Sequence, residues 1–493
     1  MKLIKKVGQS NWHFVWLVLF FVFHGYSGYI GLVSFTDLLV LLFTYLFLSV
    51  VVFLLCRWLI GNRQKAAIYT SLFMLIFLFF EDIRVFVGSW RWIASLSALK
   101  IYFPISILVL TMSLIFFKKT KLQFNRLTIF LNLILIIYII IDAGVIMTRL
   151  IGNVNNRGIT KKAQTGICDT CIKPSVYFVL MDEYWGTKAL KNYFNYDNSR
   201  FEAQLRQKGF NIIDNSYSNY GLTVFSMASI LNMDYLKNIG EQSVFNQYGY
   251  YNALLGIKAN RVCKNFEQHG YQIINYSDFD IDNHPAGISY NLLPSKGSLI
   301  SNRTMYYQLK KHIPSIFARY IKFQAFVISL GERKLTLIEQ RLSKTIDDAS
   351  RYKQKASFTY LHLNMPHNPF AYDSTGINVL NKWYDSPSLT QKDSMYLQYL
   401  VYTNKRVFSF IDTLQKVTQN KSVIILMSDH GYRRVASAKD TTLDYQNFFA
   451  IYAPLTLNSF HRDSISGVNV FRLLFNDLFH QNYPLLKDSL VTK

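Results

Sequence analysis

The sequence contains little cysteine, and this shortage excludes one class of protein. Four cysteines in 493 residues are too few to build a scaffold held together by disulfides. Cys56 lies inside a long apolar stretch, and Cys168 and Cys171 form a C-x-x-C sequence. A bare C-x-x-C is a weak signal for redox or metal chemistry, so we interpret this pair as a local disulfide or two spare thiols. A hydrophobic core must therefore hold the fold.

Acidic residues are also scarce. The chain has 30 Asp and Glu against 53 Lys and Arg, which gives a formal net charge of +23. A basic excess can indicate nucleic-acid binding, but no zinc-finger or RRM-like signature accompanies it, so we predict no nucleic-acid partner. A lipid bilayer explains the charge better, because Lys and Arg collect in short loops between membrane spans and near anionic headgroups. A merely solvated basic surface is the open alternative.

Apolar residues are abundant and unevenly distributed. They make up 51% of the chain and are concentrated in the first 150 positions. Five apolar stretches there bracket the roughly 20 residues needed to cross a bilayer. They cover residues 12–33, 36–59, 66–80, 101–117 and 127–148. The first has no small-residue cleavage site and is followed at once by another stretch, so it is not a cleavable signal peptide. We predict a membrane anchor of five transmembrane helices over residues 1–150.

The basic residues around these stretches predict the orientation of the anchor. The N-terminus and the turns after the second and fourth stretches carry ten basic residues and no acidic one: Lys2, Lys5, Lys6, Arg57, Arg63, Lys65, Lys118, Lys119, Lys121 and Arg126. The positive-inside rule places these segments in the cytoplasm and, with five spans, the C-terminal part outside. The third stretch is short and ends at Glu81 and Asp82, and its loss would invert this topology.

The remainder of the chain has the pattern of an α/β domain. Short β-rich apolar runs alternate with helical segments, as expected for a mostly parallel central sheet flanked by helices. The clearest strands are residues 176–181, 211–213, 272–274, 358–363 and 423–427, and the clearest helices are residues 199–208, 258–269 and 391–417. The first two helices each end before a glycine, which is typical of a helix C-cap. We predict a linker over residues 151–173 and a catalytic domain over residues 174–493.

Polar residues follow three of the predicted strands directly. They are Asp182, His367 and the Asp429-His430 pair. Ligand sites of open α/β sheets form outside the carboxyl ends of the strands, so these side chains are expected on one rim. Asp429 and His430 suit a divalent metal with mixed oxygen and nitrogen ligands, although an ordinary turn is the alternative. Asp182 is the natural further ligand, because an unpaired charge at the end of a buried strand is costly. Glu183 should point elsewhere.

Thr223 and two histidines have more than one interpretation. Thr223 stands at the start of a helix predicted over residues 223–231, where threonine usually serves as the N-cap. The same geometry lets backbone N–H groups bind a phosphate beside the hydroxyl, and a metal would make that hydroxyl a nucleophile. The residues alone do not decide between an N-cap and a nucleophile. His367 is placed to donate a proton or bind phosphate, or it is a surface histidine, and His362 is more simply a core histidine.

Two groups of basic residues also have more than one interpretation. Arg433 and Arg434 follow the Asp429-His430 pair and either contact anionic groups or are simply exposed. Residues 303–323 (RTMYYQLKKHIPSIFARYIKF) predict a pair of packed helices interrupted by Pro314, and an interfacial helix near the lipid headgroups is the alternative.

Together these motifs resemble the sulfatase-like branch of the alkaline phosphatase superfamily, and within it the membrane transferases typified by lipoteichoic acid synthase and the phosphoethanolamine transferases. The motifs are, in the family's order, PSVYFVLMDEYW, SNYGLTVFSMASILNMDYL, LHLNMPHNPF, YLVYTNKRVFSFID, VIILMSDHGYR and YQNFFAIYAP. The resemblance implies a divalent metal (Mn, Mg or Zn) held by Asp182, Thr223, Asp429 and His430. It also implies a nucleophilic Thr223 and a substrate-facing His367.

The resemblance further implies a multi-pass protein of the bacterial inner (cytoplasmic) membrane with an extracytoplasmic catalytic domain. Its expected reaction is transfer of phosphoglycerol or phosphoethanolamine from a membrane phospholipid to an envelope glycan or lipid through a phosphothreonine intermediate. A membrane-anchored hydrolase of phosphate or sulfate esters is the alternative. The TVFSM run that begins at Thr223 departs from the C/S-x-P-x-R motif of sulfatases, which argues against a formylglycine enzyme. Lipoteichoic acid synthase has Glu where Asp182 stands, so its glycerol-phosphate specificity is not transferred.

Overall fold

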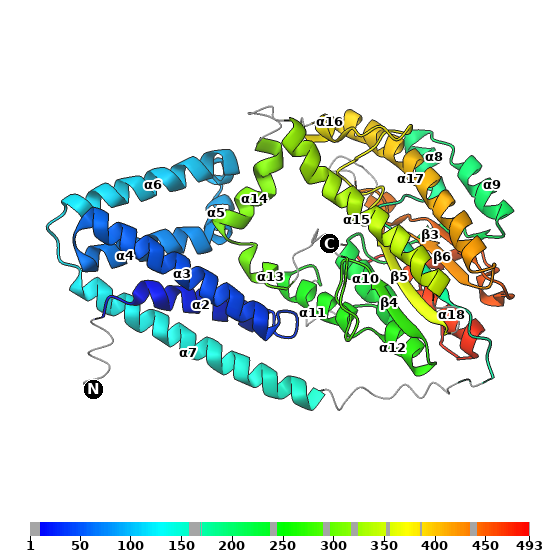
Figure 1. Ribbon diagram of the computed structural model, residues 1–493, viewed down its shortest axis with the longest axis horizontal. Helices are drawn as coiled ribbons and strands as arrows, with labels where there is room; N and C mark the ends of the chain where they lie inside the picture. Colours follow the sequence, from blue (N-terminus) through cyan, green and yellow to red (C-terminus); the bar gives the residue numbers. More distant parts are fainter. Residues whose placement is uncertain are drawn as a thin grey trace. The chain divides into compact units, whose positions relative to one another are not determined.

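The computed structural model describes residues 10–156, 168, 170–236, 244–288, 296–316, 324–351, 355–384, 387–433 and 441–492. The chain divides into two compact units (Figure 1). The first comprises Met1–Lys162 and Pro294–Ile313, and the second comprises Ala163–Leu293 and Pro314–Lys493. The domain boundaries expected from the sequence, at residues 150 and 174, stay a prediction.

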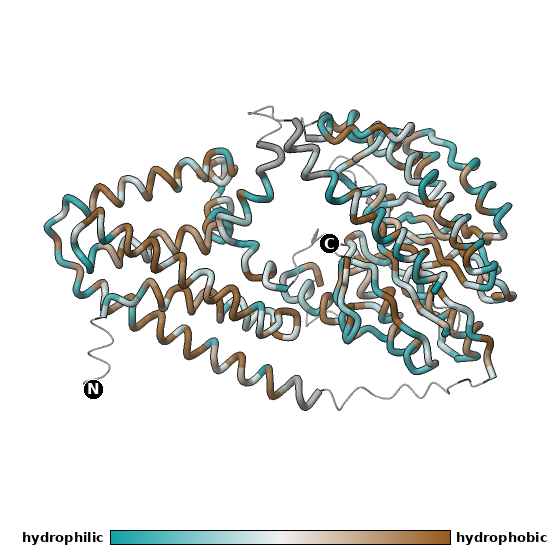
Figure 2. Tube along the Cα trace, viewed as in Figure 1, coloured by the Kyte–Doolittle hydropathy of each residue, from teal (hydrophilic) through white to brown (hydrophobic). Residues whose placement is uncertain are grey.

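The first unit is helical. Its elements are α2 (His13–Gly28), α3 (Phe35–Ile60), α4 (Arg63–Leu78), α5 (Phe80–Ser89), η1 (Ala94–Ser97), α6 (Leu99–Lys119), α7 (Asn125–Asn156), α13 (Ser298–Ser301) and α14 (Met305–Ile316). Figure 2 shows the N-terminal helices as largely hydrophobic. Among the described residues, three helical segments are long and apolar enough to cross a membrane: Phe35–Ile60, Leu99–Lys119 and Asn125–Ile151. The five-span count stays a prediction, because α2 and α4 have only 16 residues each.

The segment after Pro294 packs within the first unit. Arg303 donates from Nη1 to Asp82 Oδ1 at 3.0 Å, and the backbone carbonyl of Arg303 accepts from Glu81 N at 2.9 Å. Met305 packs in a cluster with Phe80 and Tyr102. The start of the basic, aromatic stretch therefore contacts α5 and α6, while residues 317–323 lie outside the described residues.

A six-stranded sheet organises the second unit. Its order is β2-β7-β6-β1-β5-β4, with β1 (Val176–Met181), β2 (Asn211–Ile212), β4 (Gln272–Tyr276), β5 (Ser357–Leu363), β6 (Val423–Met427) and β7 (Phe449–Tyr452). Strands β4, β5, β1 and β6 are mutually parallel, which confirms the predicted mostly parallel sheet. Strand β7 runs antiparallel to β6, and β3 (Asn215–Tyr217) pairs with β8 (Ser464–Ser466) in a small second sheet. The sequence analysis did not identify these three strands.

Helices cover both faces of the sheet (Figure 1). Alternate residues of β1 enter opposite layers, since side chains of a strand point to opposite faces. Tyr177, Val179 and Met181 join one core with residues of α8 (Thr187–Phe194), α9 (Ser199–Gln207), α15 (Gln324–Arg351) and α17 (Leu389–Val417). Phe178 packs instead on Phe471 of α18 (Val470–Phe479), with ring centroids 5.2 Å apart. The other helices of this unit are α10 (Thr223–Asn232), α11 (Gln247–Lys258), α12 (Arg261–Gln268) and α16 (Leu380–Tyr384).

Two helix ends behave as their sequences predict. Gly209 and Gly270 follow α9 and α12 with φ angles of 85° and 82°, a left-handed conformation that glycine adopts without steric cost. Each turn leads the chain directly into a strand of the sheet. The helix predicted over residues 391–417 is present as α17, and it buries Tyr396, Leu400 and Ile411 fully.

Candidate metal centre and catalytic pocket

Adjacent parallel strands bring three ligand-type side chains together. Asp182 follows β1 and the Asp429-His430 pair follows β6, and these strands are hydrogen-bonded neighbours. The carboxylate oxygens and an imidazole nitrogen of these residues lie within 4.8 Å of one another, and all three side chains are buried. The predicted metal residues therefore share one small volume.

Thr223 reaches the same volume from the start of α10. Its Oγ1 lies 3.2 Å from His430 Nε2. Leu222, not Thr223, is the N-cap residue, and Thr223 occupies the first helical position without serving as a cap. Ser226, one turn later, donates from Oγ to the backbone carbonyl of Asp429 at 2.6 Å and so ties α10 to the end of β6. The N-cap interpretation of Thr223 is wrong, and its hydroxyl faces the ligand cluster.

The polar atoms of this cluster fit a divalent cation. Asp182 Oδ1 and Asp429 Oδ2 are buried without a hydrogen-bond partner among the described residues. His430 Nδ1 lies 2.8 Å from the carbonyl of Gly431, which orients the ring so that Nε2 faces the cluster. The backbone N–H of Glu183 donates to Asp429 Oδ1 at 3.2 Å. Each carboxylate thus keeps one buried oxygen without a hydrogen-bond partner among the described residues, which is costly, so a bound cation is the natural partner.

The protonation preferences of the two carboxyl groups differ. Burial raises the pKa of Asp429, and the neighbouring charge of Asp182 raises it further. Burial also disfavours the charged form of Asp182, but the imidazoles of His367, His362 and His430 bring its pKa below the ordinary value. The cluster therefore holds at least one carboxylate that is ready to bind a cation.

Glu183 turns away from this cluster. Its φ of 61° places it in the left-handed region, which separates its side chain from that of Asp182. The Glu183 carboxylate is buried and accepts from Arg433 Nε at 3.0 Å. His367 Nε2 lies 3.8 Å from the same carboxylate oxygen. Arg433 is therefore ion-paired, while Arg434 lies outside the described residues.

A cavity of about 250 Å³ is lined by two of the candidate metal ligands, Asp182 and Thr223. Its polar lining includes Thr223, His367 and Arg433, and Leu222, Val224, Phe225 and Tyr250 form an apolar side. Thr223 and His367 thus line the same cavity although 144 positions separate them in the sequence. A substrate in this cavity would contact both polar catalytic candidates and an apolar wall.

The positions of His362 and Asp278 beside the metal ligands were not predicted from the sequence. His362, interpreted as a core histidine, is indeed buried, but its Nε2 lies 3.4 Å from Asp182 Oδ2. Its Nδ1 lies 4.0 Å from Asp278 Oδ2, beyond the end of β4. The available signal was the position of Asp278 after an apolar strand, but the predicted strand ended at residue 274, two residues before the end of β4.

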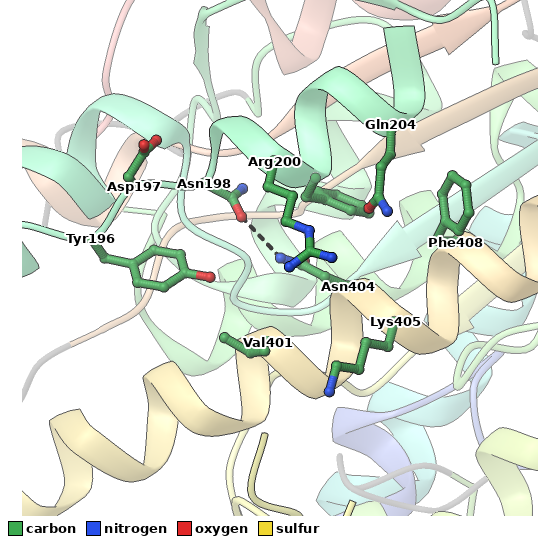
Figure 3. Close-up of a pocket in the computed structure, with 10 residues that line it drawn as sticks. Tyr196, Asp197, Asn198, Arg200, Gln204, Val401, Asn404, Lys405 and Phe408 are labelled. Atoms are coloured by element: carbon green, nitrogen blue, oxygen red, sulfur yellow. Dashed lines mark hydrogen bonds between the residues drawn. The ribbon is translucent and has the colours of Figure 1, made fainter. Parts of the chain in front are cut away.

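A second cavity lies between α9 and α17. Its volume is about 300 Å³, and Arg200, Lys405 and Phe408 are among its lining residues (Figure 3). Two of the lining residues are hydrogen-bonded to each other. Asn404 donates from Nδ2 to Asn198 Oδ1 at 2.9 Å, which is the dashed line in Figure 3. The hydroxyl of Tyr184 completes a ring, donating to Asn404 at 2.5 Å and accepting from Asn198 at 3.0 Å. This ring of hydrogen bonds joins Tyr184, which follows β1, to Asn404 of α17.

Replacing Tyr184 by phenylalanine is expected to destabilise the protein by about 1–3 kcal/mol, because it leaves a buried amide oxygen and a buried amide N–H unpaired. The measurement is the shift in thermal unfolding midpoint relative to the native chain. Tyr196→Phe is the matched control, since Tyr196 lines the same cavity but is only half-buried. Equal effects of the two substitutions would show that the ring contributes nothing.

The chain belongs to the sulfatase family, whose sequence model matches residues 174–449, more than half of the chain. It is accordingly a sulfatase-like enzyme of the metal-dependent phosphotransferase or hydrolase class. A comparison with curated proteins found no match.

Several solved structures are similar to the chain. The periplasmic domain of EcEptC from Escherichia coli, in complex with Zn, is 11% identical with a TM-score of 0.39, covering 64% of this chain and 85% of that chain. The phosphonate monoester hydrolase of Agrobacterium radiobacter is 11% identical with a TM-score of 0.39, and the match covers 64% of this chain and 79% of that chain. The lipooligosaccharide phosphoethanolamine transferase EptA from Neisseria meningitidis is 13% identical with a TM-score of 0.35, covering 93% and 95%.

Proposed function

We propose that this enzyme transfers a phospho-headgroup, phosphoglycerol or phosphoethanolamine, from a membrane phospholipid to an envelope glycan or lipid. The observation that carries the proposal is the position of Thr223, whose Oγ1 lies 3.2 Å from His430 Nε2 beside two buried carboxylates. The apolar N-terminal helices support a substrate that resides in a bilayer. We place the catalytic domain on the outer side of the bacterial cytoplasmic membrane, as the basic loops predict.

In the first half-reaction, Thr223 Oγ attacks the phosphorus atom of the phospholipid. The bond between Oγ and phosphorus forms while the bond between phosphorus and the diacylglycerol oxygen breaks. Thr223 releases its hydroxyl proton to solvent and regains one from solvent in the second half-reaction, while the departing diacylglycerol oxygen takes its proton from His367. A divalent metal held by Asp182, Thr223, Asp429 and His430 would lower the pKa of the hydroxyl and stabilise charge on the phosphoryl oxygens. The product on the enzyme is a phosphothreonine ester of the headgroup.

His367 is the candidate proton donor for the leaving oxygen. It lines the same cavity as Thr223, and its Nδ1 lies 2.6 Å from the carbonyl of Asn368, which orients the ring. In the second half-reaction an acceptor hydroxyl attacks the phosphorus atom, gives up its proton, and releases Thr223 with its proton restored. His367 acts as the base in this step, by the reverse of its first role. Water as the acceptor would make the enzyme a hydrolase, which is the alternative function.

The test uses the full-length, detergent-solubilised enzyme with fluorescent phosphatidylglycerol or phosphatidylethanolamine and Mn²⁺, Mg²⁺ or Zn²⁺. We expect diacylglycerol to be released from one of the two lipids, and the lipid that reacts names the headgroup. Adding a glycan acceptor separates transfer from hydrolysis, because transfer labels the glycan and hydrolysis liberates the free phospho-headgroup. Failure to release diacylglycerol, together with cleavage of a soluble aryl phosphate or sulfate, would overturn the lipid donor and favour the hydrolase.

A further inference from the structure

Helix α15 carries two buried cations that the proposed mechanism does not use. Lys334 and Arg341 are 1% and 0% exposed. They are seven residues apart, which is about two helical turns, so they lie on the same face of the helix. Burying a charged side chain is costly unless its N–H donors form hydrogen bonds. Both cations direct their donors to the rim of the catalytic cavity.

Lys334 holds the loop that bears His367. Its Nζ donates to the backbone carbonyl of His367 at 2.9 Å and to that of Asn368 at 3.1 Å. The second of these carbonyls is also the one that lies next to His367 Nδ1. The ammonium group therefore contacts both the backbone of the candidate proton donor and the carbonyl that orients its ring.

Arg341 joins the ends of β4 and β5. It donates to Asp278 Oδ1 at 2.6 Å and to the backbone carbonyl of His362 at 2.6 Å. Asp278 in turn accepts from Asn364 Nδ2 at 2.7 Å. His362 lies between Asp278 and the candidate metal ligand Asp182, at 4.0 Å and 3.4 Å from their carboxylates. Arg341 is therefore linked to Asp182 through Asp278 and His362.

The two cations also offset the charge of the rim. Asp182 and Asp278 line the cavity that must accept an anionic phosphate ester, and the carboxyl groups of Glu183 and Asp429 are also buried. Burial lowers the pKa of Lys334 to about 8, while the charges of Asp182, Glu183 and Asp278 act in the opposite direction. Its ammonium group is thus favoured by the same carboxylates that would repel the substrate.

We propose that α15 is the positioning helix of the site: Lys334 fixes the loop of His367, and Arg341 fixes Asp182 through Asp278 and His362. The inference rests on the proposed function in that it assigns His367 to proton transfer and Asp182 to the metal. It adds two residues that act through others and touch neither substrate nor metal. The two roles can be measured separately, because Lys334 is expected to affect kcat and Arg341 is expected to affect metal affinity.

The Lys334 half is tested by a double-mutant cycle in the full-length enzyme, with whichever phosphate ester it turns over. Lys334→Met is expected to lower kcat by about 10-fold to 100-fold and to leave Mn²⁺ affinity within about twofold. In the His367→Ala background the same change should have almost no further effect, since a residue that acts through another is not additive with it. Lys334→Gln, which keeps an N–H donor, should recover part of the loss. Equal effects in both backgrounds would overturn this half.

The Arg341 half is read from Mn²⁺ binding to the purified protein, measured by titration calorimetry without substrate. Arg341→Met is expected to weaken Mn²⁺ binding by about 10-fold to 100-fold, and Arg341→Lys to restore part of it. Lys344→Met is the matched control on the same helix, because Lys344 is exposed and forms an ion pair with Asp348 one turn away. If Arg341→Met does not fold, Asp278→Asn tests the same link. Unchanged affinity in the folded variant would overturn this half.

These readouts separate the inference from the proposed function. A native enzyme that releases no diacylglycerol but cleaves an aryl phosphate contradicts the lipid donor and leaves both tests intact. A native enzyme that transfers the headgroup, with an additive Lys334→Met effect and unchanged Mn²⁺ affinity in Arg341→Met, contradicts only the positioning role of α15.

Discussion

Thr223→Ala will lower kcat by at least about 10³-fold, the largest loss expected from any single substitution in this protein. The reason is that the change removes the only atom of residue 223 that can attack phosphorus, while the helix start remains compatible with alanine, because Thr223 does not serve as the N-cap. The measurement is diacylglycerol release under single-turnover conditions. The native enzyme, quenched during turnover, should also yield a peptide in which Thr223 carries the phospho-headgroup.

Two controls make this prediction specific. Thr223→Ser keeps a hydroxyl at the same position and should retain part of the activity. Thr413→Ala makes the same chemical change on an exposed part of α17, where the hydroxyl donates to the backbone carbonyl of Ser409, and should leave kcat within about twofold. Full activity of Thr223→Ala would refute a threonine nucleophile and would direct the search to a reaction in which water attacks directly.

Removal of divalent metal by a chelator should abolish turnover and lower the thermal unfolding midpoint. Asp182 and Asp429 place carboxylate oxygens within 4.8 Å of each other in a buried site, so the metal-free folded state contains uncompensated repulsion. A cation at 100 times its Kd stabilises the folded state by about 2.7 kcal/mol, which corresponds to an upward shift of roughly 4 °C for a domain of about 320 residues. Adding metal back should restore both activity and midpoint.

Asp429→Asn provides the matched variant for this experiment. It should lose activity and no longer change its unfolding midpoint on chelation, since one ligand is gone. In the metal-free state it should be at least as stable as the native chain, because it removes the charge that faces Asp182. A native enzyme with the same activity and midpoint before and after chelation would show that these residues hold no functional metal.

The local elements were predictable because local physics specifies them. The strand at Val176–Met181 is a run of apolar residues buried on both faces, and its predicted bounds match those of β1. The turns at Gly209 and Gly270 were predictable because a left-handed residue is the standard way to end a helix. Strand β7 was not predicted, because it has only four residues and so short an apolar run cannot be told from a buried helix segment by periodicity alone.

The site could be predicted only in part. Asp182, Asp429 and His430 follow strands, and the carboxyl ends of parallel strands meet at one rim whatever the rest of the fold does. Lys334 and Arg341 were not predicted, because they lie within a helix pattern in which most charged residues face solvent. Nothing in their local sequence distinguishes them from Lys344, which is exposed.

The sequence by itself determined the apolar N-terminal helices, the mostly parallel sheet and the three strand ends at which polar residues gather, because hydrophobic periodicity and the alternation of strand and helix segments are local properties of the chain. Only the tertiary structure decided that Thr223 faces His430, that Glu183 turns toward Arg433, and that Lys334 reaches the loop of His367. These contacts join segments far apart in the chain, and their geometry depends on how helices pack across the sheet. No local pattern encodes that packing.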